Sequence, residues 1–412
     1  MISISQCRTA AETLSQVLSP SPLIYNQRLS LKYQAHIWLK REDTLPVRSF
    51  KIRGAFNKMA TMGRGQLSKG IVCASAGNHA QGVAYSCARL QVKGTIFMPS
   101  TTPQQKISRV RHFGGDWITV VLTGDRFDDA QISAIHFAAE RSLPFIHPFD
   151  DLDVIAGQST VALEILDEMK EPLNYIIAPI GGGGLMAGIV SVCNKLSPHT
   201  RILGVEAKGA PAMYESLASG FPVQLTQIDP FADGIAVKKI GSLAFDICKN
   251  FIQQVILVPE GHICSTLLEL YSEEALVTEP AGAIGIAGLE YVKEEIRNKN
   301  VVVVVSGGNN DIARTEDVRE RALLFEGRKH YFLIRFPQRA GALKEFLEVL
   351  GPGDDITHFQ YTKKNNRDTG PALVGLELTD NRQLETLMTA MSAKGIVFQH
   401  LNHDPILFEM LV

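Results

Sequence analysis

Short apolar, β-branched runs alternate with amphipathic stretches from about residue 35 to residue 310, and this alternation constrains the fold more than any other feature. The apolar runs predict strands at 35–38, 70–74, 93–98, 117–122, 144–146, 174–180, 201–207, 254–258 and 301–306. The last contains five consecutive valines, and a strand without polar alternation suits a parallel sheet covered on both faces. The amphipathic stretches predict helices at 53–61, 80–90, 105–113, 159–169 and 185–196. Together they predict an α/β fold.

The pattern changes near residue 325, after a charge-rich helix and linker that we expect at 315–328. Strands are then predicted at 330–335, 356–362, 372–378 and 397–401, with helices at 340–350 and 383–393. The order βαββαβ folds readily as one sheet with two helices on one face. We therefore expect two domains, residues 1–324 and residues 325–412, the second of the α+β class.

The composition excludes several classes of protein. Apolar residues make up 45% and charged residues 20% of the 412, and the net charge of -2 argues against a strongly basic nucleic-acid binder. No stretch reaches the roughly 18 apolar residues of a membrane span, and the first residues lack the pattern of a signal peptide. The six cysteines form no CxxC pair and no metal-ligand spacing. We expect free thiols, no metal site, a cytoplasmic location, and no binding of nucleic acid or membrane.

A run of four glycines is the strongest functional signal. Gly181, Gly182, Gly183 and Gly184 follow a predicted strand and open a predicted helix at Leu185. Consecutive glycines cost conformational entropy, and they are useful where backbone N–H groups must wrap around an anion. The run is neither a dinucleotide fingerprint nor a Walker loop, so a single phosphate is the better ligand. A plain flexible turn is the alternative.

Four other segments lie at predicted strand ends or helix starts. They are Ser49–Ala55 with Lys51 beside Phe50, Ser75–Gly82, Glu279–Ala283 and Ser306–Asn310. Each alone is compatible with a surface lysine or an ordinary turn. Taken together, a lysine, a single-phosphate cup, and hydroxyl and amide groups at strand ends describe a site for pyridoxal 5'-phosphate, held by the lysine as a Schiff base.

In order and spacing, these five segments resemble the motifs of the fold-type II pyridoxal-phosphate enzymes, and more closely the threonine/serine dehydratase branch. The resemblance covers nearly the whole chain, and the C-terminal segment is similar to the single ACT-like regulatory domain of short-form biosynthetic threonine dehydratases. It implies a tryptophan synthase beta-like catalytic region of two open parallel-sheet subdomains, with the smaller one, about residues 45–150, inserted in the larger. The segment Asp233–Ala236 also resembles a family segment that lines the active-site cleft.

The resemblance implies a role for each matching residue. Lys51 is the Schiff-base lysine and the catalytic base, Phe50 lies against the cofactor ring, and Asn78 bonds the ring's 3-oxygen. Ser306 faces the pyridine nitrogen, Gly181–Leu185 hold the phosphate, and the substrate carboxylate is received by Ser75, Ala76, Gly77 and Asn78. No role is assigned to Glu279 or His79.

The implied activity is the dehydration and deamination of L-threonine to 2-oxobutanoate and ammonia, the first step of isoleucine biosynthesis. In the family, isoleucine is the effector at the ACT-like domain and the assembly is a homotetramer. The turn at 336–343, where such domains meet their effector, has Ala340 where the family has proline. Alternatives are a serine/threonine dehydratase or serine racemase of the same fold, or a non-catalytic amino-acid sensor. Intact Lys51, Asn78 and Ser306 argue against a sensor.

Position 76 bears on the racemase alternative. In the related racemases, a serine immediately after the residue matching Ser75 delivers a proton to the face of Cα opposite the lysine. This chain has Ala76 there, whose methyl group has no transferable proton. The sequence therefore predicts elimination with little inversion at Cα.

Overall fold

The computed structural model describes residues 1–361, 363 and 368–412. It divides into two compact units, Met1–Ile312 and Ala313–Val412, which are described separately. The helix α14 (Thr315–Phe325) thus falls in the second unit, whereas the expected domain boundary, between residues 324 and 325, lies at its C-terminal end.

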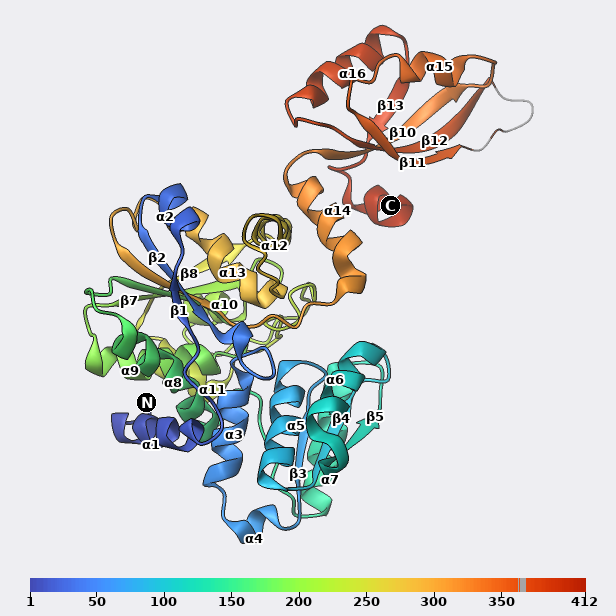
Figure 1. Cartoon of the computed structure of the whole chain (residues 1–412). Helices are drawn as coiled ribbons and strands as arrows, with labels where there is room; N and C mark the ends of the chain where they lie inside the picture. The colour runs from blue at the N-terminus through green and yellow to red at the C-terminus, as the bar shows by residue number, and fades with distance from the viewer. Residues whose placement is uncertain (362, 364–367) are drawn as a thin grey trace. The chain divides into compact units, whose positions relative to one another are not determined.

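A six-stranded sheet forms the larger part of the first unit (Figure 1). Its strand order is β1 (Leu23–Tyr25), β2 (His36–Arg41), β9 (Asn300–Val305), β6 (Tyr175–Pro179), β7 (Arg201–Ala207) and β8 (Ile252–Val258). Only β1 is antiparallel within this sheet; the other five strands run parallel. The five valines of β9 are fully buried, as a parallel strand covered on both faces requires.

Helices cover both faces of this sheet. The helices α1 (Ile4–Ser15), α8 (Leu152–Glu168), α9 (Gly184–Leu196) and α11 (Ser242–Cys248) share one apolar cluster, while α12 (Glu260–Glu274) and α13 (Pro280–Gly288) pack together on the other side (Figure 1). Two more helices are α2 (Gln27–Tyr33) and α10 (Ala212–Ser219). The strand β1 and the helices α1, α2, α7 and α10 to α13 were not among the predicted elements.

A smaller parallel sheet, with the order β3 (Ile71–Ala74), β4 (Gly94–Met98) and β5 (Ile118–Leu122), lies between β2 and β6 in the chain. The helices α5 (Asn78–Leu90) and α6 (Gln104–Gly114) pack on one face, and α7 (Phe127–Glu140) packs on the other. The short helix α4 (Arg64–Leu67) precedes β3. The predicted strand at 144–146 forms only a single bridge, from Phe145 to Val72. The expected pair of open parallel sheets is confirmed.

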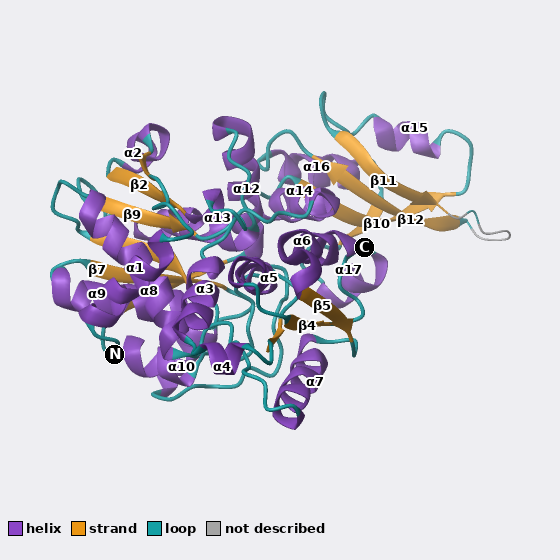
Figure 2. Cartoon of the chain, turned by 60° about the horizontal axis from the view of Figure 1, so that its bottom comes forward, coloured by secondary structure: helices purple, strands orange, loops and turns teal. Residues whose placement is uncertain are grey.

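The second unit is an antiparallel sheet with helices on both faces (Figure 2). Its order is β11 (Asp355–Tyr361), β12 (Thr369–Glu377), β10 (Lys329–Pro337) and β13 (Val397–His400), with α15 (Ala342–Leu347) and α16 (Gln383–Ala393) over Phe332 and Val374. The expected βαββαβ order is confirmed, except that Thr362 of the third predicted segment lies outside the described residues. Side chains of α14 and of α17 (Pro405–Leu411) cover Tyr331 on the opposite face, which the sequence did not predict.

All six cysteines are free and buried. Among the described residues, no helix is long and apolar enough to cross a membrane.

The helix α3 (Lys51–Thr61) joins the two sheets of the first unit, since it packs against α5 on one side and α8 on the other. Its contact with α8 is a close backbone approach: a Cβ atom on Gly157 would lie 2.4 Å from the carbonyl oxygen of Arg53, and a Cβ on Gly54 would lie 2.4 Å from Gln158. Glycine is required at both positions because any side chain would push the two helices apart.

A buried charge cluster fixes α3 in place. The Arg53 guanidinium, 1% exposed, donates to both oxygens of Glu42 at 2.7 and 2.8 Å and to Glu164 Oε2 at 2.8 Å. The buried Lys40 ammonium lies 2.9 Å from the same Glu164 oxygen. Burial alone would raise the pKa of the Glu164 carboxyl, but Arg53 and Lys40 outweigh it and hold that pKa below its usual value. The cluster joins α3, α8, β2 and the short 3-10 helix η1 (Glu42–Thr44).

We predict that Arg53→Ala lowers the free energy of unfolding by about 3–5 kcal/mol, because it leaves the Glu42 carboxylate buried without its cation. Urea denaturation at neutral pH measures the loss. The control is Lys249→Ala, which removes an exposed cation from its ion pair with Asp246 and is expected to cost less than about 1 kcal/mol. Equal losses for the two variants would show that the buried cluster does not hold α3.

Candidate active site

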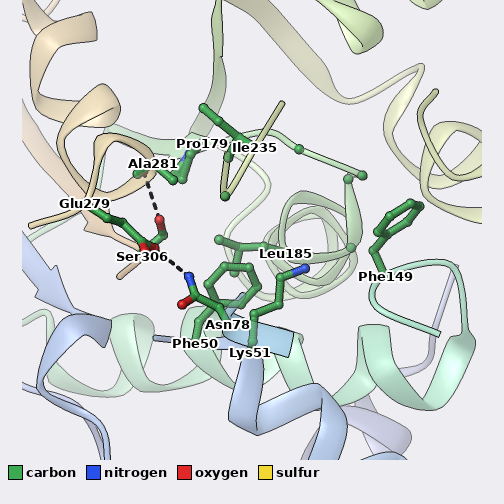
Figure 3. Close-up of a pocket in the computed structure, with 15 residues that line it drawn as sticks. Phe50, Lys51, Asn78, Phe149, Pro179, Leu185, Ile235, Glu279, Ala281 and Ser306 are labelled. Carbon is green, nitrogen blue, oxygen red and sulfur yellow. Dashed lines mark hydrogen bonds between the residues drawn. The ribbon is translucent and has the colours of Figure 1, made fainter. Parts of the chain in front are cut away.

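Segments that are far apart in the sequence meet in one pocket, at the carboxyl ends of β6 and β9 and the first turns of α3, α5, α9 and α13 (Figure 3). In open α/β sheets, ligands bind at the carboxyl ends of parallel strands. The residues that line the pocket are Phe50, Lys51, Asn78, Phe149, Pro179, Gly181, Gly182, Gly183, Gly184, Leu185, Gly234, Ile235, Glu279, Ala281 and Ser306. The structure therefore brings together every residue expected to bind the cofactor.

Lys51 is the first residue of α3 and reaches into the pocket beside Phe50 (Figure 3). Its ammonium group donates to the carbonyl oxygen of Pro148 at 3.0 Å and lies 5.3 Å from the centre of the Phe50 ring. Burial lowers the pKa of Lys51 to about 8, although the negative charge of Glu279 opposes the shift. The neutral amine, which is the form able to act as nucleophile and base, is therefore accessible near neutral pH.

The glycine run forms a tight turn between β6 and α9. Gly183 has a φ of 90°, in the left-handed region, and a Cβ atom on Gly182 would lie 2.2 Å from the ring of Phe149. The first N–H groups of α9 have no acceptor within the helix, and they carry its positive dipole end. This geometry fits a single phosphate group.

Asn78 lies at the start of α5 and is held from two sides. Its side-chain nitrogen donates to Glu279 Oε1 at 2.6 Å (Figure 3), and its oxygen accepts from the side-chain nitrogen of Asn309 at 2.7 Å. Ser306, 2% exposed, donates its hydroxyl to the carbonyl oxygen of Ala281 at 2.9 Å. That bond leaves the Ser306 oxygen free to accept from a ligand.

The residues expected to receive the substrate carboxylate form the turn between β3 and α5. The Gly77 amide donates to Ser75 Oγ at 3.2 Å, and a Cβ atom on Gly77 would meet nothing within 4 Å. Space therefore lies open beside this turn. Of the four residues named for this role, Asn78 lines the pocket, whereas Ser75, Ala76 and Gly77 are half-buried next to it.

His79 follows Asn78 but takes its place in the core. It is 3% exposed, and its Nε2 bonds the carbonyl oxygen of Ile146 at 2.9 Å. Burial, followed by the charge of Lys51, lowers the pKa of His79 to about 3, so the ring is neutral at physiological pH.

Several residues of the site escaped the sequence reasoning. The lining residues Phe149 and Pro179 were not expected, and Glu279, which lines the pocket, and Asn309, which bonds Asn78, lay in recognised motifs without a role. The sequence His147–Asp150 after a predicted strand was the available signal for Phe149, since ligand-binding loops follow such strands. Among the described residues, no group of three or more His, Cys, Asp or Glu could hold a metal ion.

The arrangement fits pyridoxal phosphate on its chemistry. A lysine of lowered pKa could engage the aldehyde, a glycine turn at a helix start could hold the phosphate, and Asn78 and Ser306 offer neutral hydrogen-bonding groups. Phe50 supplies an aromatic face of the kind that packs against a planar ring.

Comparison with known proteins agrees with this geometry. Residues 14–307 match the family of pyridoxal-phosphate dependent enzymes, and residues 320–411 match the C-terminal regulatory domain of threonine dehydratase. The chain is 50% identical over 412 residues to L-threonine dehydratase biosynthetic IlvA of Halalkalibacterium halodurans, with 100% of this chain and 99% of that relative covered. The protein of the same name from Bacillus subtilis is 50% identical over 413 residues, with 100% and 98% covered.

Solved structures of related enzymes are similar over about three quarters of the chain. The processed form of threonine deaminase isoform 2 from Solanum lycopersicum superposes with a TM-score of 0.74 at 40% identity, over 77% of this chain and 93% of that one. Maize serine racemase gives a TM-score of 0.72 at 28% identity, over 77% and 96%. The chain therefore belongs to the biosynthetic L-threonine dehydratases, fold-type II pyridoxal-phosphate enzymes with a C-terminal regulatory domain.

Proposed function

We propose that the chain is an L-threonine ammonia-lyase, which converts L-threonine to 2-oxobutanoate and ammonia in the first step of isoleucine biosynthesis. The observation that carries the proposal is the meeting of Lys51, the glycine turn, Asn78 and Ser306 in one pocket. When bound there, pyridoxal phosphate supplies an aldehyde that links to the substrate amine and a ring that takes up negative charge from Cα.

Lys51 is the residue that holds the cofactor and moves the proton at Cα. Its amine is tethered at the first turn of α3, so the base is held at the reacting carbon instead of arriving from solvent. A pKa of about 8 places this amine in the range where a general base works well at neutral pH.

The other pocket residues orient the cofactor. Gly181–Gly184 and Leu185 bind the phosphate through backbone N–H groups, and Phe50 supports the ring. Asn78 would donate to the 3-oxygen, and the Ser306 oxygen, whose proton is donated to Ala281, would accept from the protonated pyridine nitrogen. A neutral hydroxyl at that nitrogen supports the ring's positive charge less than a carboxylate would, which favours prompt loss of the β-hydroxyl over transamination.

The substrate carboxylate is received by the turn of Ser75, Ala76, Gly77 and Asn78. Two observations support this role: Gly77 caps the N-terminus of α5, a 13-residue helix, and open space lies beside it. A helix N-terminus presents N–H groups and positive dipole charge to an anion.

The second unit is the regulatory domain, and we propose isoleucine as its effector. The supporting observation is family membership, since residues 320–411 match the C-terminal regulatory domain of threonine dehydratase. A homotetramer in the cytoplasm is proposed on the same ground. The limits of the domains, 1–324 and 325–412, also stay a prediction.

We predict that Lys51→Ala abolishes production of 2-oxobutanoate while the fold is retained. Loss of both the covalent attachment and the base should cost more than the roughly 10²–10⁴-fold of a single acid–base group. A keto-acid assay with threonine measures the rate, and circular dichroism checks the fold. Near-normal turnover by the folded variant would refute the assignment of Lys51.

Deletion of Ala313–Val412 is expected to leave threonine turnover and to remove inhibition by isoleucine. The reason is that the first unit is compact by itself and contains every described residue of the pocket. Initial rates with and without isoleucine, for the full chain and the shortened one, measure the effect. A shortened enzyme that stayed sensitive would place the effector site in the first unit.

Ala76→Ser tests the racemase alternative. The wild-type chain should release 2-oxobutanoate with little D-allo-threonine, because Ala76 cannot deliver a proton opposite Lys51. The serine variant should form more D-allo-threonine at the expense of elimination, as measured by chiral chromatography after partial turnover. If the wild type already inverted Cα as fast as it eliminates, water or another residue would be the second proton donor.

A further inference from the structure

Three residues form a closed ring of hydrogen bonds beside the pocket, through their side chains and one backbone N–H group. Asn78 donates to Glu279 at 2.6 Å, Asn309 donates through its side chain to Asn78 at 2.7 Å, and the backbone N–H of Asn309 donates to the Glu279 carboxyl. The Asn309 side chain also donates to the carbonyl oxygen of Val47 at 2.8 Å. The three residues come from α5, the start of α13 and the loop after β9, so the ring connects both sheets of the first unit.

We propose that Glu279 is a positioning residue: its carboxylate, with Asn309, holds the Asn78 amide in the one orientation that presents an N–H group to the cofactor. This inference rests on the proposed function. Glu279 itself lines the pocket but acts through Asn78.

The direction of each bond decides the orientation of the amide. An asparagine side chain occupies almost the same space after half a turn, which exchanges its oxygen and its nitrogen. A carboxylate only accepts, so the nitrogen of Asn78 must face Glu279. The Asn309 nitrogen only donates, so the oxygen of Asn78 must face Asn309. One N–H of Asn78 then remains for a ligand in the pocket, and an oxygen bearing negative charge needs such a donor.

The Glu279 carboxyl has little freedom to leave this arrangement. It is 5% exposed, and a Cβ atom on Gly307 would lie 2.1 Å from Glu279 Oε1. The residue also begins α13, where its backbone oxygen accepts from Gly282 at 2.8 Å. Because residue 307 is a glycine, the Glu279 carboxyl can occupy the space beside it. The Gly307 backbone on one side and the start of α13 on the other therefore fix the position of the carboxyl.

Protonation of the Glu279 carboxyl would remove the constraint on the orientation of the Asn78 amide. Burial, helped by the negative charge of Asp233, raises the pKa of Glu279 to about 7, against the hydrogen bond from Asn78, the charge of Lys106 and the amide of Asn309. Lys51 faces the same carboxyl from α3, and Lys106 of α6 is paired with Asp233. Arg48 lies in the segment before α3, and its backbone carbonyl oxygen accepts a hydrogen bond from the amide of Gly308, the residue before Asn309. Below the pKa, the carboxyl carries a donor and no longer requires the Asn78 nitrogen.

The first experiment compares the wild-type holoenzyme with E279Q. The visible absorbance of the cofactor bound to the wild type should change with pH. One component of this change should have its midpoint near pH 7. Glutamine has the shape of glutamate but has an NH2 group in place of one carboxylate oxygen. That NH2 group would face an N–H donor of Asn78 or Asn309, which needs an acceptor. We expect E279Q to lose that component and to bind pyridoxal phosphate about tenfold more weakly, as measured by cofactor titration of the apoenzyme.

D233N supplies a second test in case E279Q folds poorly. Asp233 is 42% exposed, and its replacement removes the charge that helps to raise the Glu279 pKa while leaving the three-residue ring intact. The midpoint of the absorbance change should move to lower pH, and the component should persist.

E206Q is the matched control. Glu206 is another buried carboxyl of the first unit, 1% exposed, whose pKa burial raises to about 8. It accepts from the amides of Met213 and Tyr214 and does not line the pocket. E206Q should keep the wild-type absorbance change and cofactor affinity.

The outcomes separate the inference from the proposed function. If the wild type bound no cofactor and made no 2-oxobutanoate, the proposed function would fail. If it did both, but E279Q and D233N kept the wild-type midpoint and affinity, only the role of Glu279 would be overturned. An equal effect of E206Q would also overturn it, since the change would then follow the loss of any buried carboxyl.

Discussion

The position of Lys51 in the pocket depends on the burial of one guanidinium. Arg53 lies two residues after Lys51, and its buried guanidinium is held between Glu42 and Glu164. An arginine buried in this way is stable only in the geometry that satisfies it, because a misplaced charge would lose its partners at a cost of several kcal/mol. The glycines at 54 and 157 let α3 approach α8 closely enough for those bonds to form. The start of α3 is thereby fixed relative to the six-stranded sheet, although α3 also packs against the smaller sheet.

Exclusion of water also determines the pKa values of the ionisable groups in and beside the pocket. Lys51 and Glu279 are both desolvated, and burial disfavours the charged form of each, so their pKa values approach each other, at about 8 and about 7. The negative charge of Glu279 opposes the shift of the Lys51 pKa, and the hydrogen bond from Asn78 and the charge of Lys106 oppose the shift of the Glu279 pKa. His79, beside them in the core, is driven fully neutral. A base close to neutrality is therefore a result of packing, with no strongly polar neighbour needed.

Local pattern predicted most of the fold and most of the residues that meet in the pocket. Strands such as β6 and β9 are almost entirely apolar, and glycine runs mark the turns at which parallel strands end, so both are visible in the sequence. The short strand β1 is half-exposed and has no such pattern, and the predicted strand at 144–146 forms only one bridge. The ring of Asn78, Glu279 and Asn309 could not be predicted, because its bonds join residues 201 and 231 positions apart. The exposure of Glu279 and the space left by Gly307 are likewise properties of the assembled chain.

The distribution of charge around the pocket follows from what each part of the cofactor requires. Among the described lining residues, only Lys51 and Glu279 have ionisable side chains. A phosphate in the glycine turn would thus be held by backbone N–H groups and the N-terminal dipole of α9, with no dedicated cation opposite it. Its negative charge would favour the protonated form of Lys51, as Glu279 already does. A cationic side chain at the turn would cancel that effect but would need room that the packing of Gly182 against Phe149 does not leave. Close packing at the turn therefore has an electrostatic consequence, because it leaves Lys51 as the one cationic side chain among the described residues that line the pocket.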